Sequence, residues 1–321
     1  MSDTTHLLVP YAALHSPAGQ QALAGLALPQ LDRLLARLTP LASDLDDEEN
    51  PATPHERALA RASGLPDAGG LIPWAAWHVR GLGADAPAAP HDAAWAFVTP
   101  CHWQVRTDHV TLEDPARLGL DEAASRALLD VVAPWFAEDG IALHYDQPTR
   151  WLAHGAVFAG LASASLERVL HRDVRAWMPA SAQAAGLRRL HSEVQMLLYT
   201  HAFNAEREAR GLPPVNAFWV HGTGGLPAGA PAAPAAAPTL ELSLRGPALR
   251  EDWDAWAGAW QQLDAGPIAQ LGAYVARGGA AQLTLCGERG ALSWHSAPRS
   301  LRQKVSSIFS PQRFASVREQ L

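Results

Sequence analysis

The amino-acid sequence predicts an α/β protein, and three observations support this class. An apolar run from His6 to Ala12 is typical of a buried strand in a mostly parallel sheet. Amphipathic helices alternate with short apolar strands further along the chain. A helix over 182–210 ends at Gly-Leu-Pro-Pro and leads into a strand over 217–221 and a glycine-rich turn reaching Gly224. Such a turn exposes backbone N–H groups at the carboxyl edge of a sheet, where α/β proteins usually place ligands.

Residues 1–80 are expected to form the N-terminal part of the α/β core. Leucines recur at helical spacing over 28–38. The acidic run over 44–49 is typical of a solvated loop, because adjacent carboxylates repel one another and do not converge on one ion. Thr53 followed by Pro54 indicates the start of a helix.

Residues 81–180 predict an α+β insertion. Strands are expected over 94–98 and 102–110, followed by an amphipathic helix over 121–136. Two further strands, over 141–145 and 150–154, are expected to pair antiparallel. Residues 181–223, with the helix, the strand and the start of the glycine turn, are expected to return to the core.

The clearest change in composition is the alanine-, proline- and glycine-rich segment 224–238, which predicts a linker or loop. Residues 239–321 are expected to complete the core, with a strand over 239–244 and a final strand pair over 281–286 and 291–295. Trp253, Trp256 and Trp260 share one face of a helix over 251–263. This stripe predicts a core-facing surface more readily than a ridge that binds a partner.

Composition limits the function classes. The chain has 321 residues, 48% hydrophobic and 18% charged, which is typical of a globular protein. A formal net charge of −7 disfavours binding to nucleic acid or to an anionic membrane, although Arg299, Arg302 and Lys304 leave a local basic patch open. Two cysteines, no signal peptide and no apolar run of ~18 residues predict a soluble cytoplasmic protein.

Several segments resemble a known family. Glu193 to Leu198, His201 and the segment Asn216 to Gly224 resemble a bacterial family labelled phosphoglycerate mutase-like or regulatory. That family is similar to the archaeal-type cofactor-independent phosphoglycerate mutases of the alkaline phosphatase superfamily. In their Asn-x-x-Trp-x-Trp-Gly-x-Gly turn, His221 here replaces the second aromatic residue. Fainter likenesses are Pro29 to Leu34, and Thr99 to His102 with Asp108.

The resemblance implies an abbreviated alkaline phosphatase-like fold. Its mostly parallel sheet would be flanked by helices and interrupted by the α+β insertion. The N-terminal strand, the 217–221 strand and the C-terminal strands would share this sheet.

The candidate ligand-binding residues lie on the long helix and around the glycine turn. They are His191, Gln195, Asn216, Trp219, His221, Gly222 and Gly224. The glycines permit positive φ and close approach of a ligand, but a structural turn that packs the sheet edge fits the same pattern. His201 shares the apolar face of its helix, as a pocket residue or as a core histidine bonded to a carbonyl. The candidate catalytic residues are His102, Asp108 and His201.

The resemblance also implies two divalent metals held by Asp and His ligands, and these ligands are missing from the sequence. The first strand runs into Val9-Pro10-Tyr11-Ala12 without a carboxylate, and the late strand ends in Leu285-Cys286-Gly287-Glu288-Arg289 instead of an Asp-His pair. We therefore expect a non-catalytic regulatory or binding relative without a metal, which acts through a protein partner or a bound small phosphorylated metabolite.

Two alternatives remain open from the sequence. The first is an Mn²⁺- or Mg²⁺-dependent mutase or phosphatase with rearranged ligands, drawn from His102, Asp108, His109, His191, His201 and His221. The second is a structural protein, in which Gly222→Val would lower stability and leave partner binding unchanged.

Overall fold

The computed structural model describes residues 4–46, 49–230, 237–297 and 312–321. The chain forms two compact units. Unit 1 comprises Met1–Glu49, Thr53–Gly64 and Pro234–Leu321, and unit 2 comprises Asn50–Ala52 and Leu65–Ala233. Part of the predicted linker (231–236) and the basic residues Arg299, Arg302 and Lys304 lie outside the described residues.

Unit 1 contains a five-stranded sheet. Its strands, in spatial order, are β2 (Thr39–Leu45), β11 (Gly290–His295), β10 (Ala281–Cys286), β1 (Thr5–Val9) and β9 (Thr239–Leu240). β1 pairs in parallel with β10 and β9, whereas β11 pairs antiparallel with β10 and β2. With the helices that flank this sheet, the arrangement confirms the predicted α/β class.

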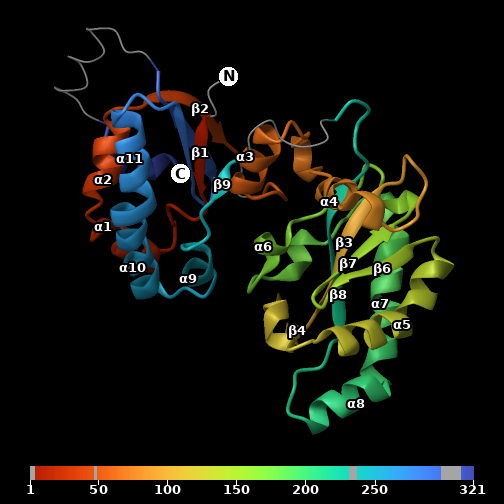
Figure 1. Cartoon of the computed structure of the whole chain (residues 1–321). Coiled ribbons are helices and arrows are strands. Elements are labelled where there is room, and N and C mark those ends of the chain that lie inside the picture. Colours follow the sequence, from red (N-terminus) through yellow and green to blue (C-terminus); the bar gives the residue numbers. More distant parts are fainter. Residues whose placement is uncertain (1–3, 47–48, 231–236, 298–311) are drawn as a thin grey trace. The chain divides into compact units, whose positions relative to one another are not determined.

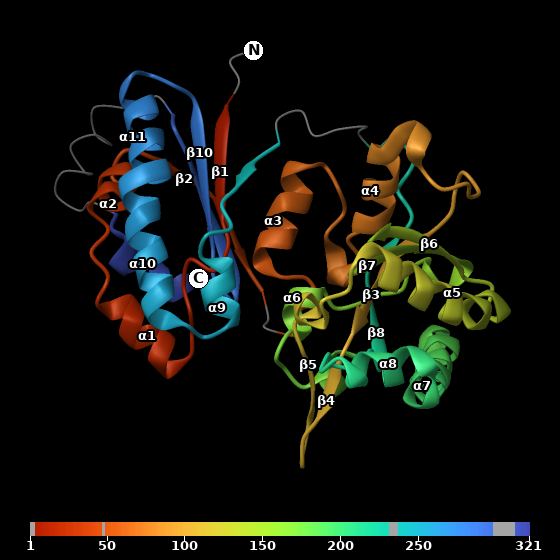
Figure 2. The same cartoon turned by 60° about the horizontal axis from the view of Figure 1, so that its bottom comes forward.

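Helices cover both faces of this sheet (Figures 1 and 2). One face carries α1 (Pro17–Ala24), α2 (Pro29–Leu35), α10 (Trp253–Leu263) and α11 (Ala269–Ala276), and the other carries α3 (Pro54–Ala62). Thr53 starts α3 with a capping box, in which its side chain accepts from Glu56 N while the Glu56 carboxylate accepts from Thr53 N. Short helices α9 (Arg245–Leu249) and α13 (Phe314–Val317) complete the unit.

Alternation along β1 and β10 separates the two sides of the sheet. Leu7, Val9, Leu283 and Leu285 belong to the main core with α1, α2, α10 and α11. Trp256 and Trp260 are fully buried in this core, and Trp253 packs against it while half-buried. The prediction of a core-facing tryptophan stripe is confirmed.

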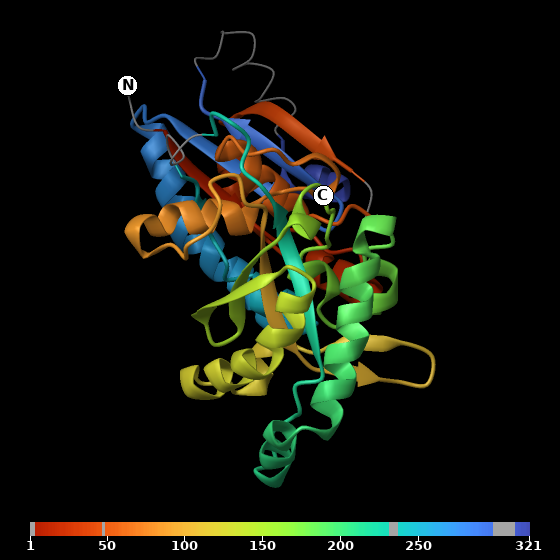
Figure 3. The same ribbon diagram turned by 90° about the vertical axis from the view of Figure 1, so that its right-hand side faces the viewer.

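Unit 2 contains a four-stranded antiparallel sheet. Its strands, in spatial order, are β6 (Ala142–Gln147), β7 (Arg150–His154), β3 (Trp95–Cys101) and β8 (Ala217–Gly224). Helices α5 (Glu122–Glu138) and α7 (Ala185–Thr200) pack on one face, and α4 (Trp74–Leu82) packs on the other. Figure 3 shows α7 running beside β8. The unit also contains helices α6 (Leu166–Val169) and α8 (Ala202–Ala209), and the hairpin of β4 (Trp103–Val105) and β5 (Val110–Leu112).

Two sequence predictions are wrong about this region. The 217–221 strand was expected in the sheet of the N-terminal strand, but β8 pairs with β3 in the sheet of unit 2. Every residue of β3 is buried, so this strand needs a partner at each edge, and β7 and β8 supply them. The helix expected over 182–210 is two helices, because His201 leaves the helical conformation with ψ of 140° and starts α8.

Candidate functional site

The predicted glycine turn is part of strand β8. Gly222 and Gly224 adopt the expected positive φ, 62° and 132°, but they lie within the strand opposite an irregularity in its pairing with β3. A Cβ at Gly222 would lie 3.0 Å from Phe97 Cδ2 and 3.1 Å from Trp74 Cβ, and one at Gly224 would lie 3.2 Å from Pro73 Cβ. These glycines therefore allow α4 to pack closely on the sheet.

Replacing Gly222 by valine is expected to destabilise unit 2 by about 2–4 kcal/mol, because a β-branched residue is strained at this φ and its Cβ crowds Phe97 and Trp74. Thermal unfolding followed by circular dichroism measures the effect. Gly186→Ala is the control, since a Cβ there meets nothing within 4 Å in helix α7. An unchanged melting temperature for Gly222→Val would contradict the packing role.

The other predicted ligand residues of this segment bind other parts of the protein. The Asn216 side chain accepts from Trp103 N (2.7 Å) and donates to Trp103 O (2.9 Å). Trp219 is buried, and its Nε1 donates to Ala164 O at 2.9 Å. His221 Nε2 is hydrogen-bonded to the Thr99 hydroxyl at 3.1 Å, and burial lowers the pKa of His221 to about 3.

His191 and Gln195 lie on α7. His191 is buried, with its ring stacked on Trp103 at 4.3 Å and tilted against Phe218 at 4.9 Å. Burial lowers the pKa of His191 to about 4, so the imidazole is neutral at pH 7. The adjoining cavity, of about 20 Å³, has space for one water molecule. Gln195 is half-buried.

The three catalytic candidates have separate local roles. His102 Nδ1 donates to Pro214 O at 2.8 Å. Asp108 is exposed in the β4–β5 turn and pairs with His109 at 2.6 Å, which lowers the pKa of Asp108. His201 caps α8 by accepting from Phe203 N at 3.1 Å. Among the described residues, no three His, Cys, Asp or Glu side chains converge in an arrangement that could hold a metal ion.

At the carboxyl end of β1, other groups of the protein form hydrogen bonds with the backbone of Tyr11 and Ala12. Trp256 Nε1 donates to Tyr11 O at 3.0 Å, and Trp260 Nε1 donates to Ala12 O at 3.3 Å. Ala12 N donates to Cys286 O at the end of β10, at 2.7 Å. Tyr11 has φ of 56°, which is uncommon for a residue with a side chain. The indoles of α10 thus close the sheet edge where α/β proteins commonly bind ligands.

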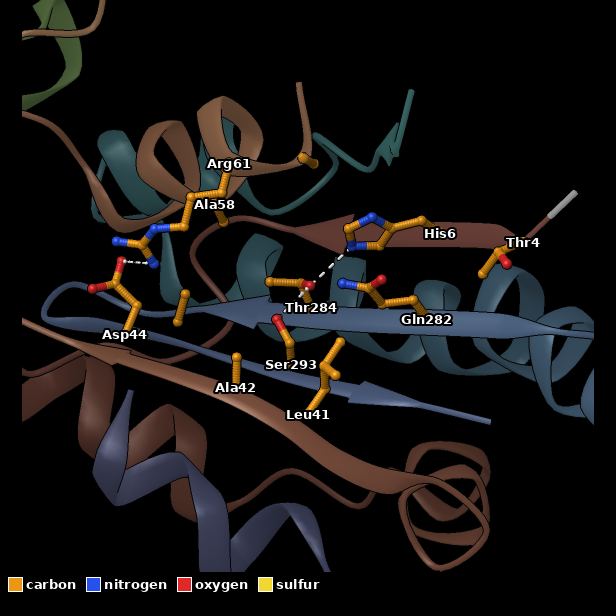
Figure 4. Close-up of a pocket in the computed structure, with 12 residues that line it drawn as sticks. Thr4, His6, Leu41, Ala42, Asp44, Ala58, Arg61, Gln282, Thr284 and Ser293 are labelled. Carbon is orange, nitrogen blue, oxygen red and sulfur yellow. Dashed lines mark hydrogen bonds and ion pairs between the residues drawn. The ribbon is translucent and has the colours of Figure 1, made fainter. Parts of the chain in front are cut away.

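A pocket with both polar and apolar lining residues lies on the other side of unit 1, between α3 and the sheet (Figure 4). Its volume is about 320 Å³, within the range of small-molecule sites. The lining residues come from β1, β2, β10, β11 and α3 and from Thr4 beside β1. They are Thr4, His6, Leu41, Ala42, Asp44, Ala58, Arg61, Ala62, Gln282, Thr284, Ala291 and Ser293. None of the residues predicted as ligand-binding or catalytic lines this pocket.

A row of hydrogen-bonded polar side chains crosses three strands at the base of the pocket. His6 Nε2 and the Thr284 hydroxyl are 2.9 Å apart, and the hydroxyls of Thr284 and Ser293 are 2.8 Å apart. Burial lowers the pKa of His6 to about 4, so this imidazole is neutral at pH 7. The row therefore offers neutral donors and acceptors to a ligand.

The charged end of the pocket is built around Asp44. Its carboxylate accepts from Arg57 Nε and pairs with Arg61 Nη1, each at 2.9 Å. The Arg57 side chain is 1% exposed, whereas that of Arg61 is 48% exposed. Asp44 was predicted in a solvated loop, but it belongs to strand β2 and its side chain is only 12% exposed. Asp44 thus holds Arg61 in place while about half of the Arg61 side chain remains exposed.

The fold and this pocket define an α/β protein with a pocket on one face of the unit 1 sheet. Among the helices of the described residues, none has the length and apolar character needed to cross a membrane. No protein-family model matches the chain, and no curated protein matches it.

Two solved structures are similar to the chain at low identity. The cofactor-independent phosphoglycerate mutase from Thermoplasma acidophilum DSM 1728 has a TM-score of 0.35 and 12% identity, over 94% of this chain and 95% of that chain. The PH0037 protein from Pyrococcus horikoshii has a TM-score of 0.43 and 12% identity, over 95% of this chain and 93% of that chain. The chemical properties of the unit 1 pocket follow from its own lining residues and not from these two structures.

Proposed function

We propose that this chain is a non-catalytic, phosphoglycerate mutase-like protein that binds a small phosphorylated metabolite in the α3 pocket of unit 1. The observation that carries the proposal is the half-exposed side chain of Arg61 at one end of a cavity that also contains the neutral polar groups of His6, Gln282 and Ser293. Arginine binds phosphate oxygens through parallel N–H donors, and such charge-assisted bonds are stronger than neutral ones. The imidazole, amide and hydroxyl groups of His6, Gln282 and Ser293 suit the remaining polar groups of such a metabolite.

The hydrogen bonds at the carboxyl end of β1 support a binding function in preference to phosphoryl transfer. An enzyme of the two-metal type needs carboxylate and imidazole ligands where the strands end. Here Trp256 and Trp260 occupy the carbonyl groups after β1, and Glu288 after β10 accepts from His15 N at 2.7 Å. In this proposal the bound metabolite acts as a regulatory signal, and no metal takes part.

Calorimetric titration of the full chain with 3-phosphoglycerate in the presence of EDTA tests the proposal. Saturable binding is expected, and Arg61→Gln should weaken it about tenfold or more, because a charge-assisted hydrogen bond contributes about 1.5–3 kcal/mol. Arg33→Gln is the matched control, since Arg33 is an exposed arginine of α2 in the same unit and does not line the pocket.

Two results would overturn this function. One is binding that Arg61→Gln leaves unchanged, which would show that the metabolite does not bind in this pocket. The other is interconversion of 3-phosphoglycerate and 2-phosphoglycerate that depends on Mn²⁺ or Mg²⁺ and follows the protein through purification. The second result would instead support an enzyme with rearranged ligands.

A further inference from the structure

We propose that unit 2 carries a separate binding site for a small organic polyanion, a molecule with at least two phosphate or carboxylate groups. The site is a cavity of about 610 Å³ between the β4–β5 hairpin, the 3-10 helix Pro115–Leu118 and the turn 211–213. Its lining is mainly polar. The lining residues are His102, Gln104, Arg106, Glu113, Asp114, Arg117, Leu118, Gly211, Leu212 and Pro213.

The hairpin supplies one wall through simple alternation. His102, Gln104 and Arg106 are spaced by two residues, so they share one face of the extended chain. Gln104 pairs with Thr111 in the hairpin, and Glu113 N donates to His102 O at 3.0 Å, which continues the ladder. The regular pairing therefore directs an imidazole, an amide and a guanidinium to the same side.

Two guanidinium groups line the cavity with most of their donors available. Arg106 Nη2 donates to Gln104 Oε1 at 2.7 Å, and Arg117 Nη1 donates to Glu113 Oε2 at 3.3 Å. A guanidinium has five N–H donors, so each arginine can also bind an anionic group in the bidentate manner. Because each of the two arginines can bind one anionic group, we assign a ligand with at least two such groups.

The remaining polar groups of the cavity are already oriented. Because a carbonyl only accepts, the bond to Pro214 O places a proton on His102 Nδ1, so Nε2 of the neutral imidazole is an acceptor that can bind a hydroxyl group of the ligand. Asp114 caps the 3-10 helix by accepting from Ala116 N at 2.9 Å. Glu113 is bound to Arg117. Both carboxylates of the cavity thus have protein partners, which reduces their repulsion of an anion.

Buried hydrogen bonds hold the walls together before any ligand arrives. Arg207 is 4% exposed and donates to both Leu118 O and Pro213 O, which ties the 3-10 helix to the turn 211–213. Asn216 fixes β4 through both polar atoms of its amide. A preorganised site of this kind loses little conformational entropy when it binds.

The test is calorimetric titration of the full chain with two probes, inorganic pyrophosphate and citrate. Arg106→Gln and Arg117→Gln should each weaken the binding of at least one probe about tenfold or more. Both side chains are exposed, so the variants should fold, and thermal unfolding verifies this. The control is Arg126→Gln, an exposed arginine that pairs with Glu122 on α5 of the same unit.

The two probes separate the sources of the anion. Pyrophosphate binding alone assigns phosphate groups, citrate binding alone assigns carboxylates, and either result supports the site. The proposal is overturned if neither probe binds saturably, or if Arg106→Gln and Arg117→Gln bind as the unmodified chain does. It is also overturned if Arg61→Gln abolishes the binding, because the anion would then occupy the pocket of unit 1.

Discussion

Replacing Trp260 by alanine is expected to lower the free energy of unfolding of unit 1 by about 3–5 kcal/mol. The Trp260 side chain is fully buried, and its ring centroid lies 6.4 Å from that of Trp256 and 5.3 Å from that of Phe314. The substitution leaves a cavity in the main core and removes the donor to Ala12 O. Hydrogen exchange of the β1 and β10 amides, measured by mass spectrometry, reports the stability of this unit.

Two further variants separate the causes of this loss. Trp260→Phe retains an aromatic ring but not the indole N–H, so it should cost less than the alanine variant, with about 1 kcal/mol from the hydrogen bond. Trp253→Ala should also cost less, because Trp253 is only half-buried. An equal cost for Trp253→Ala and Trp260→Ala would show that the full burial of Trp260 and its hydrogen bond to Ala12 O add nothing to the stability of unit 1.

Lowering the pH from 7 to 4 is expected to destabilise unit 2 by about 3 kcal/mol through His191. The pKa of a histidine is 6.5 in the unfolded chain and, for His191, about 4 in the folded protein, because burial disfavours the charged imidazole. Below pH 6.5 the unfolded chain therefore binds a proton that the folded chain does not. Stability falls as the pH decreases from 6.5 to 4 and levels off below that value.

His191→Phe should remove the His191 contribution of about 3 kcal/mol and leave that of His221, whose pKa burial also lowers, since phenylalanine keeps a ring against Trp103 and Phe218 but does not titrate. Urea unfolding at pH 7 and at pH 4, with hydrogen exchange of the α7 amides, measures the difference. His91→Gln is the control, because His91 is exposed. If His191→Phe loses as much stability as the unmodified protein between the two pH values, another group causes the effect.

Local patterns in the sequence predicted much of the fold. The helical spacing of Trp256 and Trp260 and the paired strands of β6 and β7 depend on neighbouring residues, and both predictions are confirmed. The positive φ of Gly222 was also expected. The sequence pattern did not indicate which residues pack against this glycine. In the structure they are Phe97 and Trp74.

The pocket of unit 1 could not be predicted in this way. His6 and Thr284 are 278 positions apart in sequence, and only the parallel register of β1 and β10 brings them together. Each of the two lies in a run that reads as apolar, so neither signals a polar site by itself. A clue was available in the alternation of Gln282 and Thr284 along β10, which places both side chains on one face.

The division of the chain also sets an order of assembly during synthesis. Nearly all of unit 2 is one continuous segment, Leu65–Ala233, whereas β1 must wait for β10, which begins at Ala281. As the ribosome makes the chain from its N-terminus, unit 2 can therefore close first. Meanwhile the apolar residues of β1 lack their final neighbours, so the newly made N-terminal segment is the part of the chain that most needs protection from aggregation.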